Sequence, residues 1–141
     1  MTFGTRPSNE RPGALRWHAL NASPFDGLSS IDPPRLSGVY VLLCGDRVKI
    51  GVADNIRKRI QHIRSMCPYE VRLLAVMRGD AKLEASLHER FASSRLHCEW
   101  FGVTEDLVAL VKAARKVSLD LDDRPARRAF ERIVAELRGS L

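Results

Sequence analysis

The fold is decided by residues 38–60, which read GVYVLLCGDRVKIGVADNIRKRI. The short apolar run at 39–44 predicts a central strand, because strands buried on both faces are continuously apolar. Gly45-Asp46 is a turn signal, so residues 47–52 are predicted to return as the second strand of a hairpin. This hairpin is the start of the ordered part of the chain.

A helix is predicted directly after the hairpin. Asp54-Asn55 can cap its first turn. Its buried stripe consists of three isoleucines at helical spacing, Ile56, Ile60 and Ile63. Cys67-Pro68 ends the helix, because the residue before a proline disfavours helical backbone. In the following stretch, Val71, Leu73, Ala75 and Met77 occupy alternate positions, which predicts a third strand.

A second helix is predicted after Asp80, which can cap it. The apolar stripe of this helix is Leu83, Leu87 and Phe91. Residues 95–101 are predicted to form a loop, and Thr104 can cap a third helix. The fold class predicted from these elements is α/β (α+β), with a small three-stranded antiparallel sheet flanked by helices and a further C-terminal helix.

Three regions are expected along the chain. Residues 1–36 hold five of the seven prolines and predict an irregular N-terminal arm. Four apolar side chains are candidates to pin this arm to the domain: Leu15, Trp17, Leu20 and Phe25. Residues 37–117 form the predicted domain, and residues 118–141 form a hinge and a last helix opened by Pro125. The predicted inward face of that helix is Phe130, Ile133, Val134 and Leu137.

The chain is basic, with 23 Lys and Arg against 17 Asp and Glu, a net charge of +6 and a pI of about 9.7. A basic surface attracts polyanions, so DNA is the expected partner. The alternative is that the charge serves solubility only, as in many small basic domains. No apolar stretch is long enough to span a bilayer or to act as a targeting segment, so we expect a cytoplasmic protein with no membrane partner.

The cysteines are odd in number, and they are Cys44, Cys67 and Cys98. No CxxC pair is present, so neither a disulfide framework nor a zinc knuckle is indicated. Reduced thiols in a cytosolic protein are the expected state.

Five residues suggest phosphodiester chemistry. Tyr40 could move a proton, and Lys49 and Arg59 could lower the pKa of its phenol, which is ordinarily too high for a base at neutral pH. Arg59 could also clamp a phosphate through its planar fork. Glu84 could hold Mg²⁺ with a single carboxylate and waters, and His88 lies one helical turn from it.

Each of these residues also has an ordinary structural explanation. Tyr40 could be a strand aromatic, and Lys49 could lie on a solvated strand face. Arg59 could be one of several solvated helix charges, and Glu84 and His88 could be a surface pair. Their order along a strand, turn, strand and helix favours the functional interpretation.

The quoted segment resembles the opening of a GIY-YIG nuclease domain. Gly38-Val39-Tyr40 corresponds to GIY, Lys49-Ile50-Gly51 to YIG, and Arg59 to the helix arginine of that family. The later stretches LEASLHERF and RLHCEWF resemble one branch of the superfamily, named for a coliphage DNA-binding open reading frame and a meiotically up-regulated gene. That branch has KIG in place of YIG, an E-x-x-x-H helix and a closing EWF. The resemblance covers about residues 37–115.

The resemblance implies a role for each matching residue. Tyr40 would accept the proton or orient the attacking water, and Arg59 would stabilise the charge that develops on the phosphate. Glu84 would bind Mg²⁺ or Mn²⁺, and His88 would assist near the metal or the leaving group. Lys49 would be a catalytic cation in the position of the second tyrosine.

Other residues receive less specific expectations. Gly38 and Gly51 would permit close packing near the site. Glu99 and Trp100 match the branch signature, without a chemical role that follows from it. The cations predicted to contact DNA lie on the first helix and are Arg57, Lys58 and Arg64.

The sequence departs from the family pattern in two places. Lys49 replaces a tyrosine, and no asparagine follows Asn55, although many members have one after the metal glutamate. The leading hypothesis is a metal-dependent endonuclease domain that hydrolyses DNA phosphodiester bonds. The alternative is a non-catalytic DNA-binding module of the same fold. A third hypothesis is an interaction protein that uses its C-terminal helix, through which a homodimer could also form.

Overall fold

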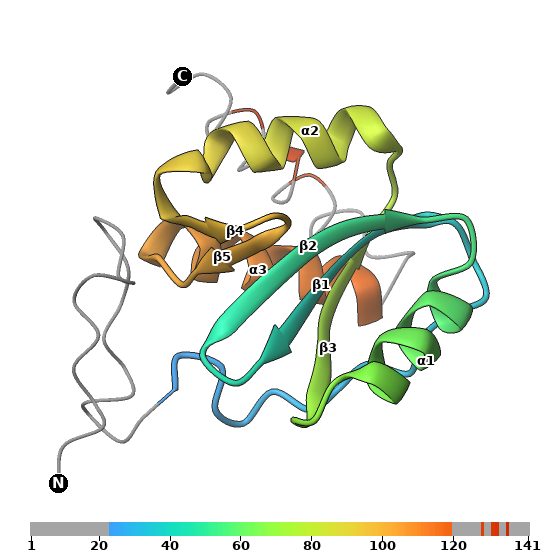
Figure 1. Cartoon of the computed structure of the whole chain (residues 1–141). Coiled ribbons are helices and arrows are strands. Elements are labelled where there is room, and N and C mark those ends of the chain that lie inside the picture. Colours follow the sequence, from blue (N-terminus) through green and yellow to red (C-terminus); the bar gives the residue numbers. More distant parts are fainter. Residues whose placement is uncertain (1–22, 120–127, 129–130, 133–134, 136–141) are drawn as a thin grey trace, which may run out of the picture.

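The structure is a computed structural model that describes residues 23–119 together with residues 128, 131, 132 and 135. Its centre is an antiparallel sheet with the strand order β3-β1-β2-β5-β4 (Figure 1). The strands are β1 (Gly38–Cys44), β2 (Arg47–Ala53), β3 (Val71–Met77), β4 (Arg95–His97) and β5 (Trp100–Gly102). The predicted α+β class is confirmed.

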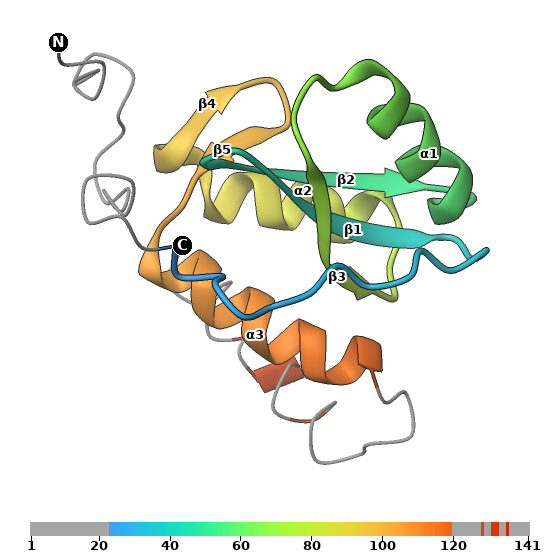
Figure 2. The same cartoon turned by 90° about the horizontal axis from the view of Figure 1, so that it is seen from below.

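Helices cover both faces of this sheet. They are α1 (Ile56–Met66), α2 (Ala81–Arg90) and α3 (Glu105–Leu119), with a short 3₁₀ turn, η3 (Ala92–Ser94), after α2. Asn55 and Asp80 cap α1 and α2 as predicted, each accepting a backbone N–H of the first turn. Figure 2 shows α1 on one side of the sheet and α3 on the other. No helix among the described residues is both long and apolar enough to cross a membrane.

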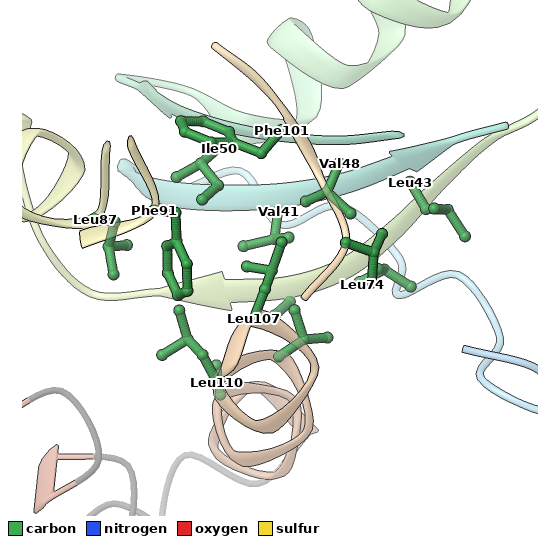
Figure 3. Close-up of a cluster of buried hydrophobic side chains, with 14 of the residues drawn as sticks. Val41, Leu43, Val48, Ile50, Leu74, Leu87, Phe91, Phe101, Leu107 and Leu110 are labelled. Carbon is green, nitrogen blue, oxygen red and sulfur yellow. The ribbon is translucent and has the colours of Figure 1, made fainter. Parts of the chain in front are cut away.

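The side chains of β1 alternate between two cores, because successive residues of a strand point to opposite faces. Tyr40 and Leu42 pack with the three predicted isoleucines of α1. Val41 and Leu43 belong to the larger cluster on the other face. Figure 3 shows this larger cluster, in which side chains from β1, β2, β3 and α3 meet Leu87 of α2. The sheet is therefore buried on both faces at β1.

The prediction of three strands was incomplete, and the loop predicted at 95–101 is in fact the β4–β5 hairpin. β5 pairs with the edge of β2, with Lys49 opposite Trp100. Strands of three residues are too short to show an alternating pattern. Their formation depends on the free backbone groups of β2, which local sequence does not reveal.

The described part of the N-terminal arm, residues 23–36, packs against the domain and forms neither helix nor strand. Phe25 is fully buried in the larger core cluster. The outer edge of β3 is closed by this arm, since Ile31 N donates to Leu73 O at 2.9 Å and Leu73 N donates to Ser30 Oγ at 3.0 Å. The other predicted pins of the arm, Leu15, Trp17 and Leu20, lie outside the described residues.

The last predicted helix lies mostly outside the described residues, including Pro125 and its whole predicted inward face. The residues described there are helical and exposed, and they are Arg128, Glu131, Arg132 and Ala135. The dimer contact expected from this helix therefore stays a prediction.

Two thiols join the end of β1 to the end of α1. Cys44 Sγ and Cys67 Sγ lie 2.9 Å apart, and all three cysteines are free thiols. Burial, together with the contact to Cys67, raises the pKa of the Cys44 thiol to about 12. Cys44 is therefore a protonated, weakly nucleophilic thiol at neutral pH.

The burial of Phe25 makes a testable prediction about the arm. We expect Phe25→Ala to lower the free energy of unfolding by about 3–5 kcal/mol, because it leaves a cavity in the core. Urea denaturation followed by circular dichroism measures this change. The matched control is Leu36→Ala, since Leu36 is 55% exposed and its loss should change stability by less than about 0.5 kcal/mol. Equal stability of the two variants would show that the arm does not contribute to the core.

Candidate functional site

Tyr40 lies in the middle of β1, and its side chain is fully buried on the α1 face. Its cross-strand partner on β2 is Gly51. A side chain at Gly51 would overlap the Tyr40 hydroxyl, so the glycine leaves the space that the phenol occupies. Gly38 has a similar role at the start of β1, where a Cβ would lie 2.7 Å from the carbonyl oxygen of Met77. The two motif glycines thus allow close packing around the site.

Burial and three charged side chains from different elements act on the Tyr40 hydroxyl. Burial raises the pKa of this phenol above its ordinary value of 10.0. Arg59 of α1 lowers the pKa by its positive charge and as a hydrogen-bond donor. The carboxylates of Glu99, in the β4–β5 turn, and Glu84, on α2, raise it. The lowering expected from neighbouring cations is therefore outweighed, and the phenol is neutral at pH 7.

The Tyr40 hydroxyl has no hydrogen-bond partner among the described residues. Arg59 lies near enough to lower the pKa of the phenol, but its geometry does not meet the criteria of a hydrogen bond to the hydroxyl. A buried polar group without a partner costs about 1–3 kcal/mol, so such a group normally meets a water or a ligand. The hydroxyl is therefore the most informative polar atom of the site.

Arg59 is exposed, although it acts on a buried hydroxyl. It lies in the first turn of α1, where its N–H donates to Asn55 O at 3.1 Å. Its guanidinium is therefore accessible to an anion from solvent, and its planar donors suit a phosphate.

Glu84 and His88 lie on α2 one turn apart, and both are partly buried. His88 Nε2 lies 2.8 Å from Ile50 O, and its ring packs at 5.1 Å from that of Phe101. A carbonyl oxygen only accepts, so Nε2 is the protonated nitrogen. This hydrogen bond ties α2 to β2 beside Gly51. The observed contact gives His88 a positioning role, and its predicted part near the metal stays a prediction.

Lys49 is held by two residues of the EWF signature. Its Nζ lies 3.4 Å from Glu99 Oε2 and 5.6 Å from the ring centre of Trp100. Among the described residues, the charges that shift the pKa of Tyr40 are Arg59, Glu99 and Glu84, and Lys49 is not one of them. The expected direct help of Lys49 to the phenolate is therefore not seen. Glu99, for which the sequence predicted no chemical role, forms the ion pair with Lys49 and also raises the pKa of Tyr40.

The three helix cations predicted to bind DNA differ in their surroundings. Arg57 forms an ion pair with Asp32 at 2.9 Å. Arg64 donates to Ser30 Oγ at 3.1 Å and to Val71 O at 3.3 Å. Arg57 and Arg64 thus fasten the N-terminal arm, although Arg64 is exposed, as Lys58 is. The pattern of helix positions could not show this, because the partners come from the arm and from β3.

The donor set suits a hard cation better than zinc. No group of three or more His, Cys, Asp and Glu residues within the described part of the chain is arranged to hold a metal. Zinc sites need about four such ligands, whereas Mg²⁺ is commonly held by one or two carboxylates, waters and substrate phosphates. Glu84, a single carboxylate near the buried hydroxyl of Tyr40, fits the pattern of ligands that is common for Mg²⁺.

The titration of Tyr40 can be measured alone, because the chain has two tyrosines and the other, Tyr69, is 70% exposed. In a Tyr69→Phe background we expect tyrosinate absorbance to rise with a midpoint above 10. Arg59→Met should raise that midpoint and Glu99→Gln should lower it, because each removes a charge that acts on the phenol.

The same shift predicts how stability depends on pH. The folded state binds this proton more tightly than the unfolded chain, so the free energy of unfolding should fall as pH rises from about 10 through the folded-state pKa. Urea denaturation at a series of pH values checks the sign. A Tyr40 midpoint at or below the ordinary value of 10.0 would contradict the burial of the phenol.

Gly51→Ala tests the close approach of the phenol. We expect a loss of about 1–3 kcal/mol in the free energy of unfolding, because the new methyl group overlaps the Tyr40 side chain. The loss should be smaller in a Tyr40→Val background, where the ring is absent. Equal losses in both backgrounds would mean that Gly51 is needed for another reason.

Comparison with known proteins identifies a domain family that covers the candidate site. Residues 37–118, more than half of the chain, match the T5orf172 domain. No curated protein and no solved structure matches the chain. The matched segment runs from the start of β1 almost to the end of α3 and so contains Tyr40, Arg59, Glu84 and Glu99. The chain therefore belongs to the T5orf172 domain family, a family of nuclease-like or DNA-binding modules related to the GIY-YIG nucleases.

Proposed function

We propose that the chain is a metal-dependent endonuclease domain that hydrolyses DNA phosphodiester bonds. The observation that supports this most directly is the Tyr40 hydroxyl, which is buried, lacks a hydrogen-bond partner among the described residues and is influenced by Arg59, Glu84 and Glu99. A water or a phosphate oxygen would provide the missing hydrogen bond. The net charge of +6 favours a polyanionic substrate.

In this proposal, Tyr40 orients the attacking water and takes up its proton. The neutral phenol must first lose its own proton to solvent, which the charge of Arg59 favours and the carboxylates of Glu84 and Glu99 oppose. Mg²⁺ or Mn²⁺ held by Glu84 would offset the charge of that carboxylate and polarise the phosphate. Proton uptake by Tyr40 would then accompany the attack of water on phosphorus, while the bond from phosphorus to the leaving oxygen breaks and that oxygen takes a proton from solvent.

Arg59 would stabilise the transition state rather than the substrate alone. Negative charge grows on the non-bridging phosphate oxygens during the attack, and a preorganised guanidinium stabilises it. The exposed position of Arg59 gives a backbone phosphate access without opening the core. His88 supports the same geometry from α2 by holding that helix against β2.

A plasmid-nicking assay tests this proposal. We expect the wild-type protein to convert supercoiled plasmid to the open-circular form with Mg²⁺ or Mn²⁺ and to stop when EDTA is added. Tyr40→Phe and Glu84→Gln should each lower the rate by about 100-fold or more, because proton transfer or metal binding is lost. Circular dichroism should show that both variants are folded.

Each variant has a matched control in the same chain. Tyr69→Phe changes an exposed phenol, and Glu89→Gln changes an exposed carboxylate on α2. Both controls should nick at the wild-type rate. Absence of nicking by the folded wild-type protein, or equal nicking by Tyr40→Phe and Tyr69→Phe, would overturn the endonuclease proposal.

The second candidate is a DNA-binding module of the same fold that does not cleave. The observations that favour it are the neutral Tyr40 phenol, which is a poor proton acceptor, and Lys49 in the position of the second family tyrosine. This candidate predicts DNA binding that weakens steeply with salt, because counterions are released from the phosphates. Binding would be indifferent to EDTA and unaffected by Glu84→Gln. Fluorescence anisotropy with a labelled duplex separates the two candidates.

A further inference from the structure

The backbone of Glu99 is held in place independently of its side-chain contacts. It lies with Cys98 in the turn between β4 and β5, and Cys98 adopts a left-handed backbone with φ of 51°. The carbonyl oxygen of Glu99 accepts the N–H of Ile50 at 3.2 Å. The backbone of Glu99 is therefore hydrogen-bonded to Ile50, the residue that follows Lys49.

The Lys49 ammonium is held by two consecutive residues of this hairpin. Its Nζ lies 3.4 Å from Glu99 Oε2 and over the ring of Trp100, its register partner on β5. The Lys49 side chain is 19% exposed and that of Glu99 is 39% exposed. An ion pair and a cation–π contact together restrict a side chain that would otherwise have many conformations.

Stability alone does not explain this arrangement. Partly exposed ion pairs contribute little to folding, and β2 and β5 are already joined by backbone hydrogen bonds. Glu99 also opposes ionisation of the buried phenol of Tyr40. The Glu99 carboxylate therefore opposes ionisation of Tyr40 and contributes little to the free energy of folding, so neither effect explains its position.

We infer that Glu99 is a positioning residue that acts through Lys49, holding the lysine ammonium over Trp100 where a DNA phosphate would bind. This inference rests on the proposed function for the identity of the anion. An ammonium has three donors, so the contact with Glu99 leaves others for a phosphate oxygen. Lys49 of the KIG motif and Glu99 and Trp100 of the EWF motif would then form one phosphate-binding site across the paired strands β2 and β5.

The position of Lys49 can be measured without any DNA. The face of an aromatic ring shields nearby protons, so the ε-methylene protons of Lys49 should resonate upfield of those of the other lysines. Lys49→Met identifies the signal by removing it. We expect Glu99→Gln to move it back toward the other lysines, and the exposed-site control Glu70→Gln to leave it unchanged. An unmoved signal in Glu99→Gln overturns the inference, whatever the protein does to DNA.

Nicking and binding together test the functional half of the inference. Removal of a carboxylate should leave DNA affinity equal or higher, whereas loss of Lys49 positioning should lower the nicking rate about tenfold. Glu99→Gln should therefore separate the two quantities, with Kd unchanged or smaller and kcat lower. In a Lys49→Met background the same substitution should change the nicking rate by less than about twofold, because Glu99 acts through Lys49.

The outcomes distinguish this inference from the proposed function. If the wild-type protein nicks DNA and Glu99→Gln nicks at the same rate, the inference fails and the endonuclease proposal stands. An equal loss in the wild-type and Lys49→Met backgrounds also overturns it, because Glu99 would then act independently of the lysine. If the wild-type protein does not nick, the proposed function fails, and the resonance measurement alone decides whether Glu99 positions Lys49.

Discussion

The site depends on one cross-strand pair, Tyr40 of β1 opposite Gly51 of β2. The glycine leaves room for the phenol, and the phenol is thereby buried with its hydroxyl unpartnered among the described residues. Burial removes water from this oxygen, which raises its pKa and makes it sensitive to every nearby charge. A phenol on an open strand face would be screened by solvent, and the charges of Arg59 and Glu84 would matter much less.

The buried apolar side chains form two clusters, one on each face of the sheet, and Tyr40 lies in the smaller one. The α2–α3 face holds most of the large apolar cluster, and that cluster supplies the packing energy of the domain. The α1 face needs only a smaller cluster, so it can accommodate one polar atom. The N-terminal arm completes the structure from outside by closing the edge of β3 and by pairing with Arg57 and Arg64.

The charges around Tyr40 act on its phenol in opposite directions. Arg59 favours the phenolate, Glu99 and Glu84 oppose it, and Lys49 is paired with Glu99. One added charge would shift the pKa of this phenol further, because electrostatic interactions near a buried group are weakly screened. A cation or a phosphate bound nearby would add its own charge to those that already act on the protonation of Tyr40.

Several features could be predicted from local sequence. The β1–β2 hairpin, α1 with its isoleucine stripe and the caps at Asn55 and Asp80 follow from periodicity and turn chemistry, which act between near neighbours. The grouping of Tyr40, Arg59 and Glu84 was accessible through the motif resemblance. The β4–β5 hairpin was missed, because strands of three residues carry no periodic signal and form only against a free strand edge.

The sequence by itself determined the strands and helices on which the candidate residues lie, because strand alternation and helical spacing are local properties. Only the tertiary structure decided what each side chain meets. It paired Lys49 with Glu99 and Trp100, assigned Arg57 and Arg64 to the arm, and bonded His88 to the backbone of β2. These contacts join residues far apart in the chain, and their energies depend on distance and burial in space, which spacing along the sequence does not encode.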